Sequence, residues 1–359
     1  MNLELLKSGP VFLTGHTGFK GAWLTVFLEN LGIEVIGYAL ESEQDSLYEI
    51  LNRKGKIRET FGDIRNFENL KKALQAASPK YVLHFAAQAL VTDAYQDPIG
   101  TFEVNSIGTA NLLEACRRTA SIERIGIVTT DKVYENKGTG RAFLEADPLG
   151  ADDPYSASKV ASEQVIRAWQ TIYSTEKDID ILALRAGNVI GGGDLSPNRL
   201  LSDIVKSRFE NKELEIRFPD SSRPWQHALD PLWGYLSALT APKSKIEQFG
   251  RSFNFGPNSQ SMRVRDVIAI AEDFWPNQIK AIYPSNENQL YEASLLDLNS
   301  DLAQIALQWN PIWSQTESVL KTLFWWDAVK MGKLSPMEAC MLDIDDALDY
   351  LNLPGKNAQ

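Results

Sequence analysis

Cysteine and histidine are scarce in this 359-residue chain, which has only two cysteines and three histidines. Cys116 and Cys340 are far apart and have no histidine at metal-ligand spacing, so the sequence indicates neither a disulfide framework nor a metal site. We expect both to be small buried side chains in a reducing compartment.

A basic excess and a long apolar run are also lacking. Lysine and arginine number 36 against 47 acidic residues, a formal net charge of -11, which argues against a nucleic-acid partner because phosphate binding needs clustered basic side chains. No apolar run approaches the roughly 20 residues of a membrane helix, and no signal-peptide pattern opens the chain. We therefore expect a cytoplasmic protein with no membrane partner.

What the sequence does contain is an alternation of β-branched runs with longer amphipathic segments. The runs are VFLTG, EVIGYAL, YVLHFAA, IGIVTT and ILALRAGNVI, and the first leads the chain directly into a strand. This alternation predicts a Rossmann-type α/β fold with a doubly wound parallel sheet, which we assign to residues 1–188.

After residue 188 the sequence changes, with a GGGD cluster, several prolines and aromatic-rich segments. We expect residues 189–359 to form a smaller mixed α/β lobe for the substrate, with some segments returning to the first domain. The strand RSFNFGP and the helix MRVRDVIAIAEDFW are assigned to this lobe. A tail helix is predicted to begin at Ser335, where Ser-Pro-x-Glu is a helix start signal.

The segment TGHTGFKG places three glycines at the turn from the first strand to the first helix. Small residues there let the backbone approach a pyrophosphate while the helix directs its free N–H groups at it, although an ordinary tight turn has the same composition. The residues predicted to contact a dinucleotide in this loop are Gly15, Thr17, Gly18, Phe19, Lys20 and Gly21.

Acidic residues after later strands extend this prediction to the rest of the cofactor. Glu41 or Glu43 follows the second strand, where an acid bonds the adenosine ribose, and the lack of a nearby arginine favours NAD over NADP. Lys20 remains a possible partner for a 2′-phosphate. Asp63 and Ile64 are suited to the adenine edge, but an aspartate before a helix is equally a helix cap.

Tyr155 and Lys159 lie four residues apart in DPYSASK, on one face of a helix predicted to begin near Pro154. An ammonium beside a phenol favours the phenolate and lowers its pKa, so Tyr155 can act as a base. A solvent-exposed pair is the plain alternative. The polar cluster of Thr130, Asp131 and Lys132 at the end of an upstream strand argues against it, because ligands bind at such strand ends.

At this point the chain resembles the extended short-chain dehydrogenase/reductases, from about residue 10 to residue 257, and within them the dehydratases that act on CDP-glucose. The stretches that carry the resemblance are TGHTGFKGAWL, GYAL, HFAAQALV, NSIGTANLLEA, VTTDKVYEN, DPYSASK, RAGNVIGGGD and RPWQHALDPLWGYL. Related dehydratases for dTDP-glucose and GDP-mannose typically have Glu where this chain has Lys132.

The resemblance implies a three-stage reaction that uses NAD and regenerates it. Tyr155, assisted by Lys159, takes the C4 hydroxyl proton while Thr130 bonds the same oxygen. Asp131 then protonates the departing C6 hydroxyl, and Lys132 is a candidate for transferring the C5 proton. The product is a 4-keto-6-deoxy sugar nucleotide of the kind used in deoxysugar and surface-polysaccharide (O-antigen) biosynthesis.

The resemblance also implies binding residues and an assembly. Ala86, Ala87, Gln88 and Asn105 are expected at the cofactor, with Asn105 supporting Lys159 through water. Gln88, Asn188, Arg199, Arg223 and His227 are expected at the nucleotide sugar, the arginines because a guanidinium matches phosphate oxygens. A homodimer, or a dimer of dimers, is implied, built on the helices that carry Asn105 and Tyr155. His16 and His84 are assigned no catalytic role.

Three other functions share these motifs. A nucleotide-sugar 4-epimerase needs the loop and the Tyr-Lys pair but neither Asp131 nor Lys132. A dehydratase for another NDP-hexose also fits, because the segment GADDPYSASK differs from the Gly-Gly-His-Asp stretch usual in the family and leaves substrate preference open. A non-catalytic dinucleotide sensor of the same fold is the third, since fold does not fix function.

Overall fold

The computed structural model describes residues 2–138, 140–176, 178–283 and 296–355. At its centre is a seven-stranded sheet with the order β11-β6-β5-β4-β1-β2-β3, and every neighbouring pair is parallel. The strands are β1 Val11–Thr14, β2 Val35–Ala39, β3 Arg58–Phe61, β4 Tyr81–His84, β5 Arg124–Val128, β6 Asp180–Ala186 and β11 Ser252–Phe255. The predicted doubly wound parallel sheet is confirmed.

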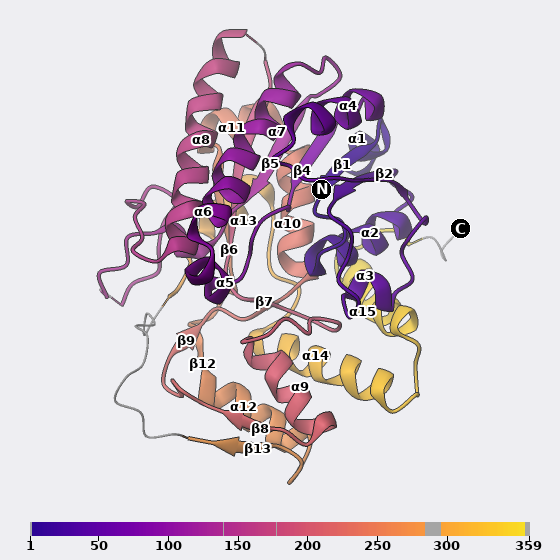
Figure 1. The fold of residues 1–359 in the computed structure, drawn as a ribbon, viewed down its shortest axis with the longest axis vertical. Coiled ribbons are helices and arrows are strands. Elements are labelled where there is room, and N and C mark those ends of the chain that lie inside the picture. The colour runs from indigo at the N-terminus through magenta and orange to yellow at the C-terminus, as the bar shows by residue number, and fades with distance from the viewer. Residues whose placement is uncertain (1, 139, 177, 284–295, 356–359) are drawn as a thin grey trace.

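Helices cover both faces of this sheet (Figure 1). On one face, α4 Phe67–Ala77, α7 Gly108–Arg117 and α8 Pro154–Glu176 share a core with the strand residue Phe12. On the other, α2 Phe19–Asn30 and α10 Leu229–Thr240 share a core with its neighbours Val11 and Leu13. Because successive strand side chains point to opposite faces, two buried faces explain why the strands read as continuous apolar runs.

Short helices lie between the strands and at the chain's start. They are α1 Leu3–Lys7, α3 Leu47–Ile50, α5 Val91–Gln96, α6 Pro98–Phe102, the π-helix η1 Glu103–Ile107 and the 3-10 turn η2 Asp131–Val133. The prediction that the chain runs directly into a strand missed α1. That helix is capped by the Asn2 side chain and held by Leu6, which is completely buried.

The smaller lobe lies below the sheet in Figure 1 and is built around α9 Leu200–Glu210, α12 Val264–Phe274 and α14 Gln315–Lys330. Three two-stranded pairs accompany these helices: β7 Val189–Ile190 with β10 Gln226–His227, β9 Ser222–Arg223 with β12 Met262–Arg263, and β8 Glu213–Glu215 with β13 Lys280–Ile282. The lobe therefore mixes helices with very short strands.

One strand that we assigned to the smaller lobe belongs elsewhere. The segment RSFNFGP forms β11, which pairs with β6 at the edge of the main sheet. Phe253 and Phe255 are completely buried there. The chain reaches β11 through α10 and α11 Lys243–Phe249, and α13 Asp301–Leu307, which comes later in the chain, packs against β11. The second half of the chain thus returns to the first domain with a whole strand.

The predicted tail helix is confirmed as α15 Pro336–Tyr350, with a capping box between Ser335 and Glu338. It packs against α14 and α2 and buries Cys340. Both cysteines are buried free thiols, as expected. Within the described ranges, no helix is long and apolar enough to cross a membrane, and no cluster of three or more His, Cys, Asp or Glu side chains is arranged to hold a metal ion.

Candidate active site

A cleft of about 2000 Å³ opens at the carboxyl ends of the parallel strands and reaches into the smaller lobe. It includes the ends of β1 and β4, between which the strand order reverses, and this reversal is where ligands bind in open α/β sheets. Residues from the smaller lobe, such as Leu214, Arg217 and Phe218, line its other wall. A long ligand in this cleft would contact both halves of the chain.

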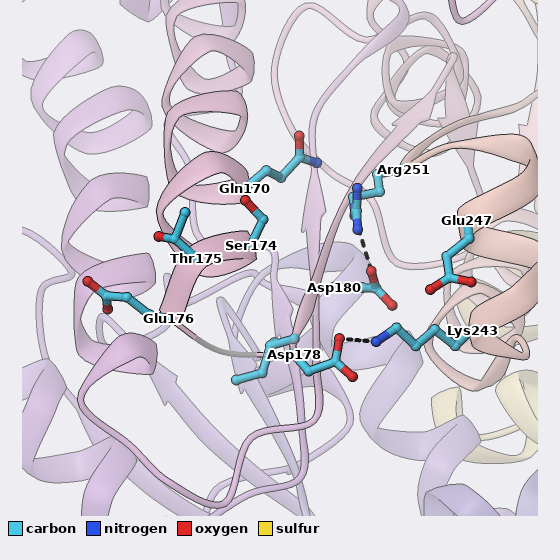
Figure 2. Close-up of a pocket in the computed structure, with 10 residues that line it drawn as sticks. Gln170, Ser174, Thr175, Glu176, Asp178, Asp180, Lys243, Glu247 and Arg251 are labelled. Atoms are coloured by element: carbon cyan, nitrogen blue, oxygen red, sulfur yellow. Dashed lines mark hydrogen bonds and ion pairs between the residues drawn. The ribbon is translucent and has the colours of Figure 1, made fainter.

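A second depression of about 350 Å³ lies at the opposite end of β6, where that strand begins (Figure 2). Asp180, the first residue of β6, forms ion pairs with Arg251 (3.1 Å) and Arg124 (3.4 Å), and Lys243 pairs with Asp178. These pairs tie α11 and β11 to β6. The depression is therefore part of the packing between elements and is remote from the strand ends that carry the predicted site.

The loop between β1 and α2 has the backbone shape that a pyrophosphate requires. Gly15 has φ = +74°, and a Cβ there would lie 2.6 Å from the Ala86 nitrogen. A Cβ on Gly21 would lie 2.1 Å from the Gly15 oxygen, so the helix can approach the loop only at a glycine. α2 begins directly after Gly18, which leaves its first N–H groups facing the cleft. These residues fit a dinucleotide.

We expect Gly21→Ala to destabilise the protein, because its Cβ would overlap backbone atoms that cannot move independently. The expected loss is about 1–3 kcal/mol, measured as a lowered midpoint of thermal unfolding in cofactor-free protein. Gly18→Ala is the matched control, since its Cβ would meet nothing closer than 3.5 Å. It should leave stability unchanged and weaken only dinucleotide binding. Equal unfolding midpoints for both variants would contradict this account of the loop.

The residues predicted for the adenosine end all line the cleft, namely Glu41, Glu43, Asp63 and Ile64. Glu41 pairs with Lys54 at the surface. Asp63 is not a helix cap, because the side chain of Asn66 caps α4. Instead its carboxylate takes hydrogen bonds from the Arg65 side chain, which hold its pKa below the ordinary value. Asp63 is therefore not a helix cap, and it is still predicted to bind the adenine edge.

Lys20 lies close to the reacting groups and not at the adenosine end. Burial, followed by the charges of Lys159 and Arg199, lowers its pKa to about 7, while Asp131 opposes the shift. Its ammonium also lies 5.8 Å from the Phe85 ring centre. We therefore withdraw Lys20 as a partner for a 2′-phosphate and keep it as a cation at the centre of the cleft.

β5 and α8 bring the predicted catalytic hydroxyls together. Thr130 follows β5, donates a hydrogen bond of 2.9 Å to Asp131 and also hydrogen-bonds Tyr155 on the first turn of α8. Burial raises the pKa of Tyr155 to about 12, although Thr130 and Arg199 act to lower it. The expected lowering of that pKa by Lys159 is therefore absent from the cofactor-free protein, because burial disfavours the phenolate more strongly.

Lys159 lies one helical turn beyond Tyr155 and is only 7% exposed. Burial lowers its pKa to about 8, and the charge of Glu163 opposes this shift. His84 lies nearby but is bonded through both ring nitrogens, to Thr14 (2.6 Å) and Thr109 (3.2 Å). Burial and the charge of Lys159 lower its pKa to about 3, so it is neutral and structural.

Asp131 is a buried carboxyl whose surroundings favour the protonated form more than water does. It is 2% exposed, and burial raises its pKa above the ordinary value despite the opposing charge of Lys132. Its Oδ2 is buried and has no hydrogen-bond partner within the described part of the chain. Lys132 lines the cleft beside it. A buried carboxyl that lines the cleft and has an unpartnered oxygen can donate a proton to a leaving hydroxyl.

Asn105 is placed behind the cleft and not on its wall. It is 1% exposed, accepts a hydrogen bond from the Gln88 nitrogen (2.9 Å), and donates to the Gln88 oxygen (3.0 Å) and to Ser158 Oγ (2.8 Å). It thus joins the segment after β4 to α8. Gln88, Ala86 and Ala87 line the cleft. These contacts use both amide hydrogens of Asn105, which does not line the cleft and positions the segment after β4 from behind it.

The residues predicted for the nucleotide sugar separate into two groups. Asn188, Arg199 and Arg223 line the cleft, and Arg199 is oriented by Asp194 at 3.1 Å. His227 does not reach it. Its ring is completely buried, its Nδ1 accepts from the Leu229 nitrogen, and its Nε2 lies 3.5 Å from Asp343 on α15. His227 therefore ties the tail helix to β10 and is withdrawn as a diphosphate ligand.

His16, the remaining histidine, is also completely buried, and its Nε2 lies 3.0 Å from Glu59. Burial lowers its pKa. Because both rings are buried and bonded, we assign no catalytic role to His16 or His84.

One feature of the site was missed from the sequence, a buried ion pair between Glu163 and Arg185 behind Lys159. The available signals were a glutamate four residues after Lys159 and an arginine inside the apolar run ILALRA. A charged residue in such a run needs a buried partner.

Fold and site together define a protein that holds a dinucleotide at a Rossmann switch point beside a Tyr-Lys pair. The model of the NAD dependent epimerase/dehydratase family matches residues 11–256, and the chain belongs to this family. The chain is 36% identical over 330 residues to the CDP-glucose 4,6-dehydratase of Salmonella typhimurium, covering 90% of this chain and 92% of that protein.

The chain is also similar to other dehydratases and to epimerases at lower identity. A dTDP-glucose 4,6-dehydratase of Xanthomonas campestris is 25% identical, covering 88% of this chain and 92% of the relative. Among solved structures, the dTDP-glucose 4,6-dehydratase of Bacillus anthracis in complex with NAD superimposes with a TM-score of 0.74 at 20% identity, over 90% of this chain and 98% of that one. An epimerase of Methanothermobacter thermautotrophicus reaches 0.79 at 21% identity, over 92% and 95%. These structures share the fold.

Proposed function

We propose that the chain is a hydro-lyase that uses NAD to convert CDP-D-glucose into CDP-4-dehydro-6-deoxy-D-glucose. The observation that supports this most directly is Asp131, a buried acid with an unpartnered oxygen beside Thr130 and Tyr155. A 4-epimerase acts at one carbon and needs no such acid. The 36% identity to a CDP-glucose 4,6-dehydratase over most of both chains supports the same reaction.

Each stage of the reaction has a group in the cleft. Tyr155 removes the C4 hydroxyl proton, and Thr130 holds the same oxygen. Bound NAD would accept two electrons from C4 and later return them to C6, and its cationic ring would add positive charge beside Tyr155. The resulting C4 ketone acidifies the C5 proton, which Lys132 takes and gives back to C5 when C6 is reduced. Asp131 donates its proton to the C6 hydroxyl, which leaves as water.

Several cations line the cleft among its acidic side chains. Lys20, Lys132, Arg199 and Arg223 line it, and Lys159 lies just behind. Two diphosphates, one from the cofactor and one from the nucleotide sugar, would bring matching negative charge. We assign residues 1–188 mainly to the cofactor and residues 189–359 mainly to the nucleotide sugar, with β11 completing the first domain.

The proposal is tested by incubating the enzyme and NAD with CDP-, dTDP-, UDP- and GDP-glucose in parallel. We expect a 4-keto sugar, detected by its absorbance in alkali, with the highest kcat/KM for CDP-glucose. A C4-epimerised sugar without keto product would favour an epimerase, and preference for another nucleotide would keep the dehydratase but change its substrate. No turnover together with NAD binding would favour a dinucleotide sensor.

We further propose that the chain forms a homodimer through the helices beside α8. Tyr95 on α5, Ile99 and Phe102 on α6, and Ile107 on η1 are 52%, 73%, 37% and 56% exposed. Consecutive exposed apolar side chains of this size are typical of an interface. Both α6 and η1 pack against α8, which carries Tyr155, so the interface would support the site.

We expect Ile99→Glu combined with Ile107→Glu to give a monomer, because two charges would be buried against the partner without counter-ions. Light scattering coupled to size-exclusion chromatography measures the mass. Phe324→Glu is the control, since Phe324 is 50% exposed on α14, far along the chain from these helices. It should leave the mass unchanged. A wild-type chain that is already monomeric would rule out this interface.

A further inference from the structure

A buried ion pair lies directly behind the Tyr-Lys pair. Glu163 on α8 is 1% exposed and Arg185 on β6 is 3% exposed. The Arg185 guanidinium donates two parallel hydrogen bonds to the Glu163 carboxylate, from Nε to Oε1 at 2.9 Å and from Nη2 to Oε2 at 2.8 Å. Thr129 at the end of β5 donates a third, of 2.7 Å, to Oε1. The carboxylate is therefore fixed in one orientation.

Arg185 is itself held by further contacts. Its Nη1 donates to the Tyr134 hydroxyl (2.8 Å) and to the Glu145 carbonyl (3.0 Å), and the Tyr134 hydroxyl donates in turn to Asn254 on β11 (2.6 Å). A buried ion pair is weak evidence for stability, because desolvation of both charges offsets their attraction. Because this densely bonded pair lies behind the cleft, its presence is more simply explained by the groups on which its charge acts.

The pair is joined to the reacting groups through two neighbouring residues. Thr129 bonds Glu163, and the next residue, Thr130, bonds Tyr155, so β5 is tied to α8 on either side of Lys159. Positions 155, 159 and 163 are four residues apart and share one face of the helix. Helical spacing therefore places Lys159 one turn from Tyr155 and one turn from Glu163.

The groups around Lys159 differ in charge. Tyr155 on α8 and His84 on β4 are neutral in the cofactor-free protein, and Lys20 on α2 is a second cation. Within the described ranges, Glu163 is the negatively charged group that acts on Lys159, and it opposes the fall of the Lys159 pKa that burial causes. Without that charge, a lysine this deeply buried would lose its proton more readily.

We propose that Glu163, oriented by Arg185 and Thr129, is a positioning residue that keeps Lys159 charged and aligned with Tyr155. This inference rests on the proposed function, in which Lys159 must be cationic to assist the base. On this proposal, the strength of Tyr155 as a base also depends on the Glu163 carboxylate, which lies two helical turns away.

Two variants that break the same pair should have opposite effects. Glu163→Gln removes the negative charge, so the pKa of Lys159 should fall by about one unit. Arg185→Gln leaves the carboxylate without its partner, so the pKa of Lys159 should rise by about one unit. Both variants should unfold at a lower temperature than the wild type. If the ion pair had a purely structural role, both variants should therefore shift the Lys159 pKa in the same direction.

The measurement is the pH dependence of Lys159 acetylation by acetic anhydride in the full-length, cofactor-free protein, followed by peptide mass spectrometry. It needs no turnover, so it tests the inference even if the proposed reaction is wrong. In active enzyme, the basic limb of the kcat/KM profile with CDP-glucose should shift in the same two directions. Glu176→Gln is the control, since Glu176 ends the same helix in an exposed pair with Arg117.

If either single variant does not fold, Glu163→Gln with Arg185→Gln removes both charges together and should still lower the Lys159 pKa, by less than Glu163→Gln would. Opposite shifts in the single variants, or a fall in the double variant, support the proposal. Shifts in the same direction, or an unchanged Lys159 pKa in the variants that fold, overturn it.

Discussion

Tyr155→Phe is expected to lower kcat for 4-keto product by about a hundred- to ten-thousand-fold, the usual contribution of a positioned acid or base. The phenylalanine ring fills the same buried space, and only the hydroxyl that bonds Thr130 is lost. The unfolding midpoint and the affinity for NAD should therefore change little. Steady-state assays with CDP-glucose, calorimetric NAD titration and thermal unfolding check the three expectations.

Tyr173→Phe provides a control on the same helix. Tyr173 is completely buried, and its hydroxyl donates a hydrogen bond of 2.9 Å to the Leu113 carbonyl, on the core side of α8 away from the cleft. Its loss should cost about 1 kcal/mol of stability and leave kcat unchanged. The two variants should thus separate activity from stability. Full activity in Tyr155→Phe would rule out Tyr155 as the base.

Local patterns sufficed where one short segment determines the geometry. The glycine spacing places Gly15 and Gly21 where a side chain would collide with backbone, and the four-residue spacing places Tyr155 and Lys159 on one helical face. The capping box at Ser335 predicted the start of α15 in the same way. Each feature depends on residues within one turn or one loop.

Predictions that depended on distant partners failed. His227 lies in a segment that reaches the cleft, but its ring turns into the core, where Trp23, Trp313 and the α15 residue Asp343 surround it. β11 looked like part of the smaller lobe, because nothing within RSFNFGP shows that it pairs with β6.

Competition between neighbours explains the smaller errors. Asp63 and Asn66 are both good capping residues, and only the structure shows that Asn66 takes this role. The pKa of Tyr155 was expected to fall because a cation lies nearby, yet burial raises it to about 12 in the cofactor-free protein. A sequence shows which charges are present, but it does not show how deeply each is desolvated.

Asp131→Asn should separate the oxidation from the loss of water. An amide fills the same space beside Thr130 but has no carboxyl proton to give the departing C6 hydroxyl. The 4-keto-6-deoxy product should therefore form about a hundred- to ten-thousand-fold more slowly. Oxidation at C4 relies on Tyr155 and Thr130 and should continue, so reduced nicotinamide should accumulate in its near-ultraviolet absorbance after CDP-glucose is added.

Asp194→Asn removes a carboxylate from the same cleft without touching the reacting groups, because Asp194 acts on Arg199. It should raise KM and lower kcat much less than Asp131→Asn does, which distinguishes loss of an acid from loss of negative charge. If Asp131→Asn forms keto product at the wild-type rate, Asp131 is not the acid. If it releases a C4 epimer, the oxidised sugar can be reduced again at C4, and Asp131 is then the residue that commits this cleft to dehydration.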